Sequence, residues 1–206
     1  MVYYCFLIRS KISCMSTPRI LPLTEPLTGR LAQSMTKLLP PGTPAPKLFL
    51  TVAKNEGLFN YLVEAGLIGP SGLLDRRSLA KDLRETIILR TCVATRNAYE
   101  FNLHVQTISV RMGLSVEQIA DLKNPLVSPE LWTAAQQQVV RLVDALVARF
   151  SISDTDFEQA RKHFKEEELM DITQLVGFYV GVAMMVGLIQ PEFDRYRAGP
   201  VETLDS

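Results

Sequence analysis

The chain has 206 residues, enough for one domain that buries a core of its own. Its 47% hydrophobic and 21% charged residues exclude a disordered chain, a collagen-like chain and a coiled-coil rod. The 22 basic and 22 acidic residues cancel, so the net charge does not draw the protein toward nucleic acid or an anionic membrane.

The N-terminal segment is expected to be a tail. An apolar run, residues 2–8, precedes Arg9 and Lys11, whereas a signal peptide has its basic residues first and a small-residue cleavage site afterwards. We therefore expect residues 1–15 to form a poorly ordered tail and residues 16–206 to form a single domain.

The rest of the chain shows helical spacing of its apolar residues, and no segment has the alternation and hairpin turns of strands. Helix boundaries are marked by Gly113, by a capping box that starts at Ser115 and by Ser128 before Pro129. The sequence therefore predicts an all-α fold. The predicted helices, in chain order, are 24–39, 47–66, 78–95, 97–112, a short helix from 115, 129–150, 156–165 and the apolar run 172–191.

The last predicted helix has two interpretations. Residues 172–191 carry no formal charge and are long enough to span a bilayer, and Gly177 and Gly181 have the spacing of membrane helix pairs. However, polar residues interrupt the run and no basic cluster flanks it. We therefore favour a buried helix in a soluble bundle or at a subunit interface.

The densest group of reactive side chains lies in two adjacent predicted helices, within residues 83–119. On the first helix, three side chains that are separated by seven and then four positions lie on one stripe. On the second helix, three side chains that are separated by three and then four positions lie on one face. Because the connection is short, the two stripes can meet. A carboxyl group facing an imidazole in an apolar wall is a general acid/base arrangement. The residues are Glu85, Cys92 and Arg96 on the first helix and Asn97, Glu100 and His104 on the second.

Structural roles explain some of these residues equally well. Asn97 and Glu100 have the spacing of a helix cap and its partner, so capping and function remain open alternatives for both. Cys92 lies among apolar residues and is typical of a small, inert core residue. The three cysteines include no CxxC pair, which argues against a disulfide scaffold and a zinc site. We expect a cytoplasmic protein.

Residues 47–122 resemble the carboxymuconolactone decarboxylase-like family, which has the alkyl hydroperoxidase D-like all-α fold. The resemblance rests on KLFLTVAKNEGLFNYL, on LRETIILR, and on AYEFNLHV followed by GLSVEQIADL. In the redox branch of that family a helix glutamate is followed by a CxxC and then by a histidine. Glu85 and His104 match the glutamate and the histidine, whereas Asn97 and Glu100 occupy the cysteine positions. The chain therefore resembles the branch without the CxxC.

This resemblance implies an enzyme, a decarboxylase-like lyase without metal or cofactor that decarboxylates or moves a proton on a small organic acid or lactone. In this hypothesis His104 exchanges the proton with the substrate, and Glu85 sets the orientation and protonation of His104. The candidate catalytic residues are Glu85, His104 and Glu100, and the candidate substrate-binding residues are Asn97, Tyr99, Phe101 and Cys92.

Two alternatives remain. One is a peroxiredoxin-like antioxidant that uses Cys92 alone, which the missing CxxC disfavours. The other is a non-catalytic small-ligand-binding protein or structural oligomer. In each case the expected partners are a small molecule and further copies of the chain, in a dimer, trimer or hexamer, without nucleic acid or membrane.

Overall fold

The computed structural model describes residues 17–69, 78–197 and 204, and these contain nine α-helices, two 3₁₀ helices and no strand. The all-α prediction is therefore confirmed. The expected tail, residues 1–15, lies outside the described residues. The α-helices are α1 (Gly29–Leu38), α2 (Lys47–Val52), α3 (Glu56–Glu64), α4 (Lys81–Ala94), α5 (Ala98–Thr107), α6 (Val116–Asp121), α7 (Ala134–Arg149), α8 (Asp154–Ala160) and α9 (Glu166–Ile189).

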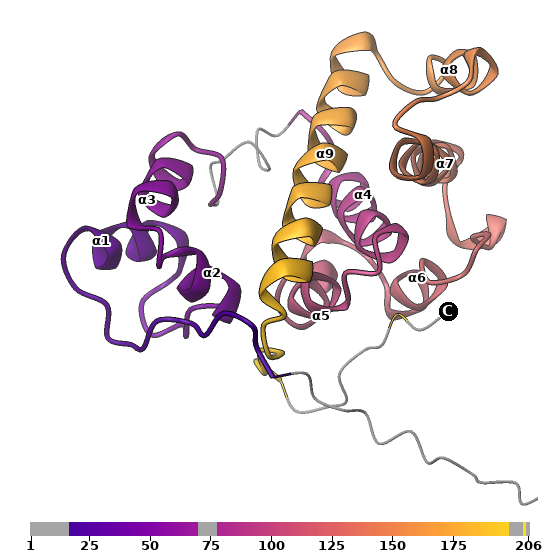
Figure 1. The fold of residues 1–206 in the computed structure, drawn as a ribbon. Helices are drawn as coiled ribbons and strands as arrows, with labels where there is room; N and C mark the ends of the chain where they lie inside the picture. The colour runs from indigo at the N-terminus through magenta and orange to yellow at the C-terminus, as the bar shows by residue number, and fades with distance from the viewer. Residues whose placement is uncertain (1–16, 70–77, 198–203, 205–206) are drawn as a thin grey trace, which may run out of the picture.

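The helices form two groups with α9 between them. In Figure 1 the N-terminal helices α1 to α3 lie on one side of α9, and α4 to α8 lie on the other. The first group has an apolar cluster of its own, in which Met35 of α1 packs with Phe59 and Val63 of α3. The larger cluster joins α4, α5, α7 and α9, and it forms the main core of the described residues.

Helix α4 lies in the centre of that main core. It packs against α5, α7 and α9, and every residue from Glu85 to Cys92 is buried. A helix that is covered on all sides is normally apolar all round, so a glutamate in its buried part needs partners from the neighbouring helices. The fold thus places Glu85 where its partners must come from the elements packed around α4, which are α5, α7, α9 and the 3₁₀ helix Ser109–Met112.

Several helices begin or end away from the predicted boundaries. The predicted helix 47–66 divides into α2 and α3, because Asn55 caps α3 by accepting the backbone N–H of Leu58. Residues Pro129–Leu131 form a 3₁₀ turn, and α7 begins only after a capping box between Thr133 and Gln136.

Other boundaries shift by a few residues. The first predicted helix begins at Gly29, five residues later than expected, and the third begins at Lys81. The fourth ends as an α-helix at Thr107 and continues as a 3₁₀ helix, Ser109–Met112. Gly113 then adopts a φ of 105°, as its predicted position after a helix end requires.

Helix α9 is buried on one face only. Ile172, Leu175 and Val176 lie in the main core, whereas Met184 and Leu188 are exposed. Among the described residues it is the one helix long and apolar enough to cross a membrane by length and composition, a test that core helices of soluble proteins also pass. The expected full burial of this helix is therefore not found within a single chain.

Candidate functional site

The turn between α4 and α5 brings the two predicted polar stripes together. Arg96 adopts a left-handed conformation with φ 56°, and the backbone N–H of Asn97 donates to the carbonyl oxygen of Cys92 at 2.8 Å. This tight connection returns the chain along α4, and the two helices pack against each other. Glu85 near the start of α4 and His104 near the end of α5 therefore meet.

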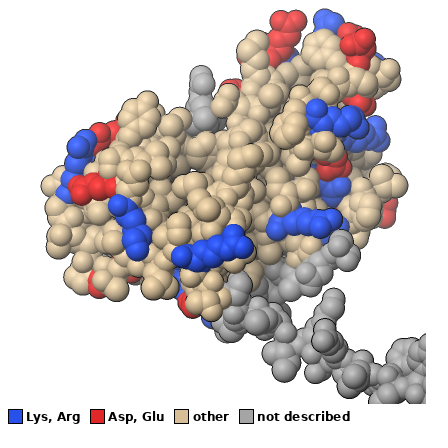
Figure 2. All heavy atoms as spheres, viewed as in Figure 1, with Lys and Arg blue, Asp and Glu red and all other residues tan. Residues whose placement is uncertain are grey.

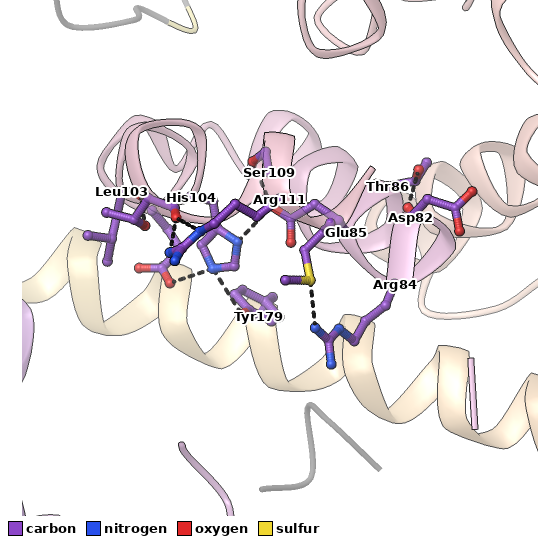
Figure 3. Close-up of polar contacts among 12 residues, drawn as sticks. Asp82, Arg84, Glu85, Thr86, Leu103, His104, Ser109, Arg111 and Tyr179 are labelled. Carbon is purple, nitrogen blue, oxygen red and sulfur yellow. Dashed lines mark hydrogen bonds and ion pairs between the residues drawn. The ribbon is translucent and has the colours of Figure 1, made fainter. Parts of the chain in front are cut away.

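Glu85 and His104 are directly bonded inside the protein. Nδ1 of His104 donates to Oε1 of Glu85 at 2.9 Å, and the hydroxyl of Ser109 donates to the same oxygen at 2.7 Å. The side chain of Glu85 has no exposed surface and that of His104 is 6% exposed. Figure 3 shows Ser109 and Glu85 approaching the imidazole from the side away from α9.

The other ring nitrogen of His104 faces two more groups. Nε2 lies 3.5 Å from Oε1 of Glu100 and 3.2 Å from the hydroxyl of Tyr179. The ring of Tyr179 meets the imidazole edge-on, with centroids 5.6 Å apart and an angle of 81° between the planes. Tyr179 projects from α9 toward the imidazole in Figure 3. The imidazole is thus held between a carboxylate on each nitrogen.

These contacts determine the charge of the pair. Burial lowers the pKa of His104, but the charge of Glu85 and the hydrogen bonds to Glu100 and Glu85 outweigh it and raise the pKa to about 10. Burial raises the pKa of Glu85, but the charge of His104 and the hydrogen bonds from His104 and Ser109 bring it below its usual value. At neutral pH the site therefore contains an imidazolium beside a carboxylate.

Three buried polar atoms of the cluster have no hydrogen-bond partner among the described residues. They are Oε2 of Glu85, Oε2 of Glu100 and Nδ2 of Asn97. Buried polar groups are almost always hydrogen-bonded in folded proteins, because an unpaired one costs about 1–3 kcal/mol. Two free acceptors and one free donor beside an imidazolium are therefore suited to a small polar molecule.

The structure separates the roles of Asn97 and Glu100. Oδ1 of Asn97 accepts the backbone N–H of Glu100 at 3.2 Å, so Asn97 caps α5 as one of its interpretations predicts. The side chain of Glu100 does not complete a capping box, since the backbone N–H of Asn97 is bonded to Cys92. The carboxylate of Glu100 is directed to His104 instead.

Cys92 lies beside the cluster but is poorly suited to redox chemistry. It is 1% exposed and belongs to the main core. Burial raises the pKa of its thiol well above the usual value, and the charges of Glu100 and Glu85 raise it further. The thiolate is the reactive form of cysteine, so this environment disfavours attack on a peroxide.

The remaining two candidate residues are placed away from the imidazole's polar contacts. The hydroxyl of Tyr99 accepts the backbone N–H of Leu48 at 3.0 Å and donates to the carboxylate of Asp194. Phe101 has no exposed surface and packs in the main core, with the ammonium of Lys123 5.7 Å from its ring centroid. The contacts given for Tyr99 and Phe101 are therefore with residues other than His104, Glu85 and Glu100.

Sequence reasoning missed two members of the cluster, Ser109 and Tyr179. Ser109 follows His104 by five residues, a spacing that does not repeat on an α-helix, and it reaches Glu85 because the chain turns into a 3₁₀ helix there. Tyr179 could have been noticed in the sequence, because it places a hydroxyl in a largely apolar helix and the hydroxyl of a buried tyrosine usually forms a hydrogen bond.

No metal centre is formed in the part of the chain that the structure describes. Within it, no group of three or more His, Cys, Asp and Glu side chains is placed so that it could hold a metal ion.

The segment that contains Glu85, Glu100 and His104 is similar to a known protein family. Residues 71–145 match the model of the carboxymuconolactone decarboxylase family, and no curated protein or solved structure matches the chain. The match begins and ends later in the chain than the resemblance over 47–122, so it omits α2 and α3 and includes most of α7. It contains Glu85, Glu100 and His104 but not Tyr179. The resemblance to the carboxymuconolactone decarboxylase family is therefore supported over residues 71–145, which match the model of that family.

Proposed function

We propose that the protein is a decarboxylase-like enzyme that uses acid/base chemistry, without a metal or cofactor, on a small organic acid or lactone. The observation that carries this proposal is the imidazolium of His104, buried between Glu85 and Glu100 while one oxygen of each carboxylate is free of hydrogen bonds. A site built only for stability would be expected to satisfy these oxygens, because each unpaired buried group is destabilising.

The chemistry requires one proton from His104. When a carboxylated substrate loses carbon dioxide, the C–C bond breaks, its electron pair stays on the substrate and a proton takes the place of the carboxylate. The Nε2–H of His104 supplies that proton, and water later restores it. Glu85 holds the imidazolium in position through Nδ1. A simple proton transfer within the substrate would use the same groups in both directions.

Glu100 and Asn97 would contact the bound molecule in this proposal. The free oxygen of Glu100 and the free amide nitrogen of Asn97 offer an acceptor and a donor at the N-terminal end of α5. The side chain of Glu100 is 10% exposed, whereas that of Glu85 has no exposed surface. The cluster therefore reaches the protein surface at Glu100. A substrate would therefore approach from the side of Glu100.

The other two functions have less support. Antioxidant activity through one cysteine would need Cys92 as a thiolate, which its burial and the two neighbouring carboxylates oppose. A purely structural network is favoured by the deep burial of Glu85 but opposed by the three unpaired polar atoms.

The test is turnover by purified protein of carboxymuconolactone, of related carboxylated lactones and of β-keto acids. Carbon dioxide release detects decarboxylation, and exchange of carbon-bound hydrogen in deuterium oxide detects proton transfer. His104→Ala and Glu85→Gln should lower kcat/KM by about 100-fold or more. His163→Ala is the matched control, because His163 is the chain's other histidine and is exposed. Full activity of His104→Ala, or no turnover by the wild type, would refute the proposal.

We further propose that the protein works as a homo-oligomer in the cytoplasm. The exposed apolar residues in the C-terminal half of α9, Met184 and Leu188, support self-association, since large apolar patches on a protein surface often mark interaction sites. Figure 2 shows that uncharged residues dominate the middle of the face on which α9 lies, with most charged residues toward its margins.

A further inference from the structure

Tyr179 belongs to the cluster although it comes from another part of the chain. It lies in α9, more than thirty residues beyond the segment that matches the family. It is 4% exposed, and its hydroxyl lies 3.2 Å from Nε2 of His104. Neither the family match nor the polar stripes of α4 and α5 assign this residue a role.

The geometry leaves His104 a single nitrogen for exchanging protons. Nδ1 is bonded to Glu85, so a proton can pass to or from a ligand only through Nε2. The positions next to Nε2 are already taken by the hydroxyl of Tyr179 and by Oε1 of Glu100. A bound molecule therefore reaches this nitrogen through one of these two groups, or must displace one of them.

We propose that Tyr179 is a catalytic residue that passes the proton between Nε2 of His104 and the bound molecule. In this step the Nε2–H bond breaks and its proton goes to the oxygen of Tyr179, while the O–H bond of Tyr179 breaks and its proton goes to the substrate. Tyr179 is unchanged at the end, and His104 becomes neutral. This proposal rests on the proposed function, to which it adds the path of the proton.

A phenol suits this path better than a carboxylate does. The hydroxyl of Tyr179 can accept from Nε2–H and donate its own hydrogen at the same time, whereas an ionised carboxylate only accepts. Burial raises the pKa of Tyr179 well above its usual value, as do the charges of Glu100, Glu85 and Cys92, while Arg84 acts in the opposite direction. The phenol therefore stays protonated and ready to donate.

The experiment compares Tyr179→Phe with wild type in the turnover assay, using carboxymuconolactone, related carboxylated lactones and β-keto acids as probes. The loss of the hydroxyl should lower kcat by about 100-fold and leave KM within a few-fold, because the ring and its packing remain. The matched control is Tyr196→Phe, whose hydroxyl bonds to the carbonyl oxygen of Pro44. Its kcat should equal that of wild type.

A second measurement separates a relay from a structural role. In mixtures of water and deuterium oxide, a relay moves two protons in one step, so kcat should fall along a curve as deuterium increases. The residual activity of Tyr179→Phe should fall along a straight line. Replacing Tyr179 with 3,5-difluorotyrosine, which keeps the ring and the hydroxyl but makes the phenol more acidic, should change kcat without changing thermal stability.

The outcomes distinguish this inference from the function on which it rests. If wild type is active, His104→Ala is inactive and Tyr179→Phe keeps the wild-type kcat and the curved deuterium response, the proton does not pass through Tyr179. A Glu100→Gln variant that alone removes the curvature would assign the path to Glu100 and would also overturn the proposal. If wild type turns over none of the probes, the proposed function fails and the relay fails with it.

Discussion

Oε1 of Glu85 accepts two hydrogen bonds, one from Nδ1 of His104 at 2.9 Å and one from the hydroxyl of Ser109. Because this oxygen must accept from both, Nδ1 carries the hydrogen and the imidazole has one fixed orientation. In the proposed reaction, the nitrogen that exchanges the proton is then Nε2, which faces Glu100 and Tyr179. Ser109 therefore contributes to the site by fixing the carboxylate that fixes the imidazole.

The Glu85–His104 pair predicts a stability that depends on pH. The pKa of His104 rises from an ordinary value of 6.5 to about 10 on folding, so its contribution is complete below pH 6.5 and is lost as pH rises toward 10. The pKa of Glu85 is lowered from 4.5, so its contribution is complete above pH 4.5 and is lost in acid. The pair should stabilise the fold most between these two limits.

Urea unfolding at a series of pH values measures this effect. The free energy of unfolding of wild type should fall between pH 6.5 and 10, and His104→Gln should show a much smaller fall over the same range. His163→Gln, which removes the exposed histidine, should follow wild type. If the free energy of unfolding of wild type and of His104→Gln depended on pH in the same way, Glu85 and Glu100 would not raise the pKa of His104.

The burial of Cys92 predicts an unreactive thiol. In a protein with Cys5→Ser and Cys14→Ser, Cys92 is the remaining cysteine. Its thiol should react with a disulfide reagent or with hydrogen peroxide only slowly at pH 7, at a rate limited by opening of the fold, because burial and the nearby carboxylates raise its pKa. Mass spectrometry of the protein after equimolar peroxide measures the reaction. Rapid oxidation of Cys92 would instead support the one-cysteine peroxidase.

The sequence was sufficient to predict the pairing of α4 with α5, because local spacing determines it. Glu85 lies on a helical stripe, His104 lies on another, and the short link at Arg96 permits only a reversal of the chain. Helix ends with a specific cap were also predictable, as Gly113 and Ser115 show. Such features depend on residues within one or two turns of each other.

Features that depend on distant packing could not be predicted in this way. Spacing along one helix does not show which side of α9 meets the imidazole, so Tyr179 was missed. Tyr99 lies one residue from Glu100, yet a one-residue step turns a helical side chain by about 100°, and its hydroxyl bonds to Leu48 and Asp194. The partner Asp194 is far along the chain and had no sequence signal.

The bonds of Tyr99 predict a structural role for its hydroxyl. Tyr99 and the backbone N–H of Lys47 both donate to Asp194, which ties α2 and the C-terminal segment to α5. Asp194→Ala leaves these two donors, whose hydrogen bonds are partly buried, without their partner and should lower the free energy of unfolding by about 1–3 kcal/mol. Tyr99→Phe should also destabilise the protein, and it should leave KM for any turned-over probe unchanged. Urea unfolding and steady-state kinetics check the two effects.

A nearby exposed ion pair provides the control for this contact. Nζ of Lys47 lies 2.7 Å from Oε2 of Glu192, and both side chains are open to solvent. Glu192→Gln should therefore change the free energy of unfolding by less than about 1 kcal/mol. Equal effects of Glu192→Gln and Asp194→Ala would contradict the role assigned to Tyr99 and Asp194.

The outer face of α9 predicts self-association at micromolar concentration. Met184 is 69% exposed and Leu188 is 58% exposed, and an added Cβ at Gly177 or Gly181 would meet no atom within 4 Å. Burying such a face against a second copy is favourable, so Met184→Glu should shift the sedimentation coefficient toward that of a monomer. Leu126→Glu changes an exposed leucine on another part of the surface and should leave assembly unchanged. Wild-type protein that sediments as a monomer would refute this prediction, and its co-flotation with phosphatidylcholine vesicles would assign the face to lipid.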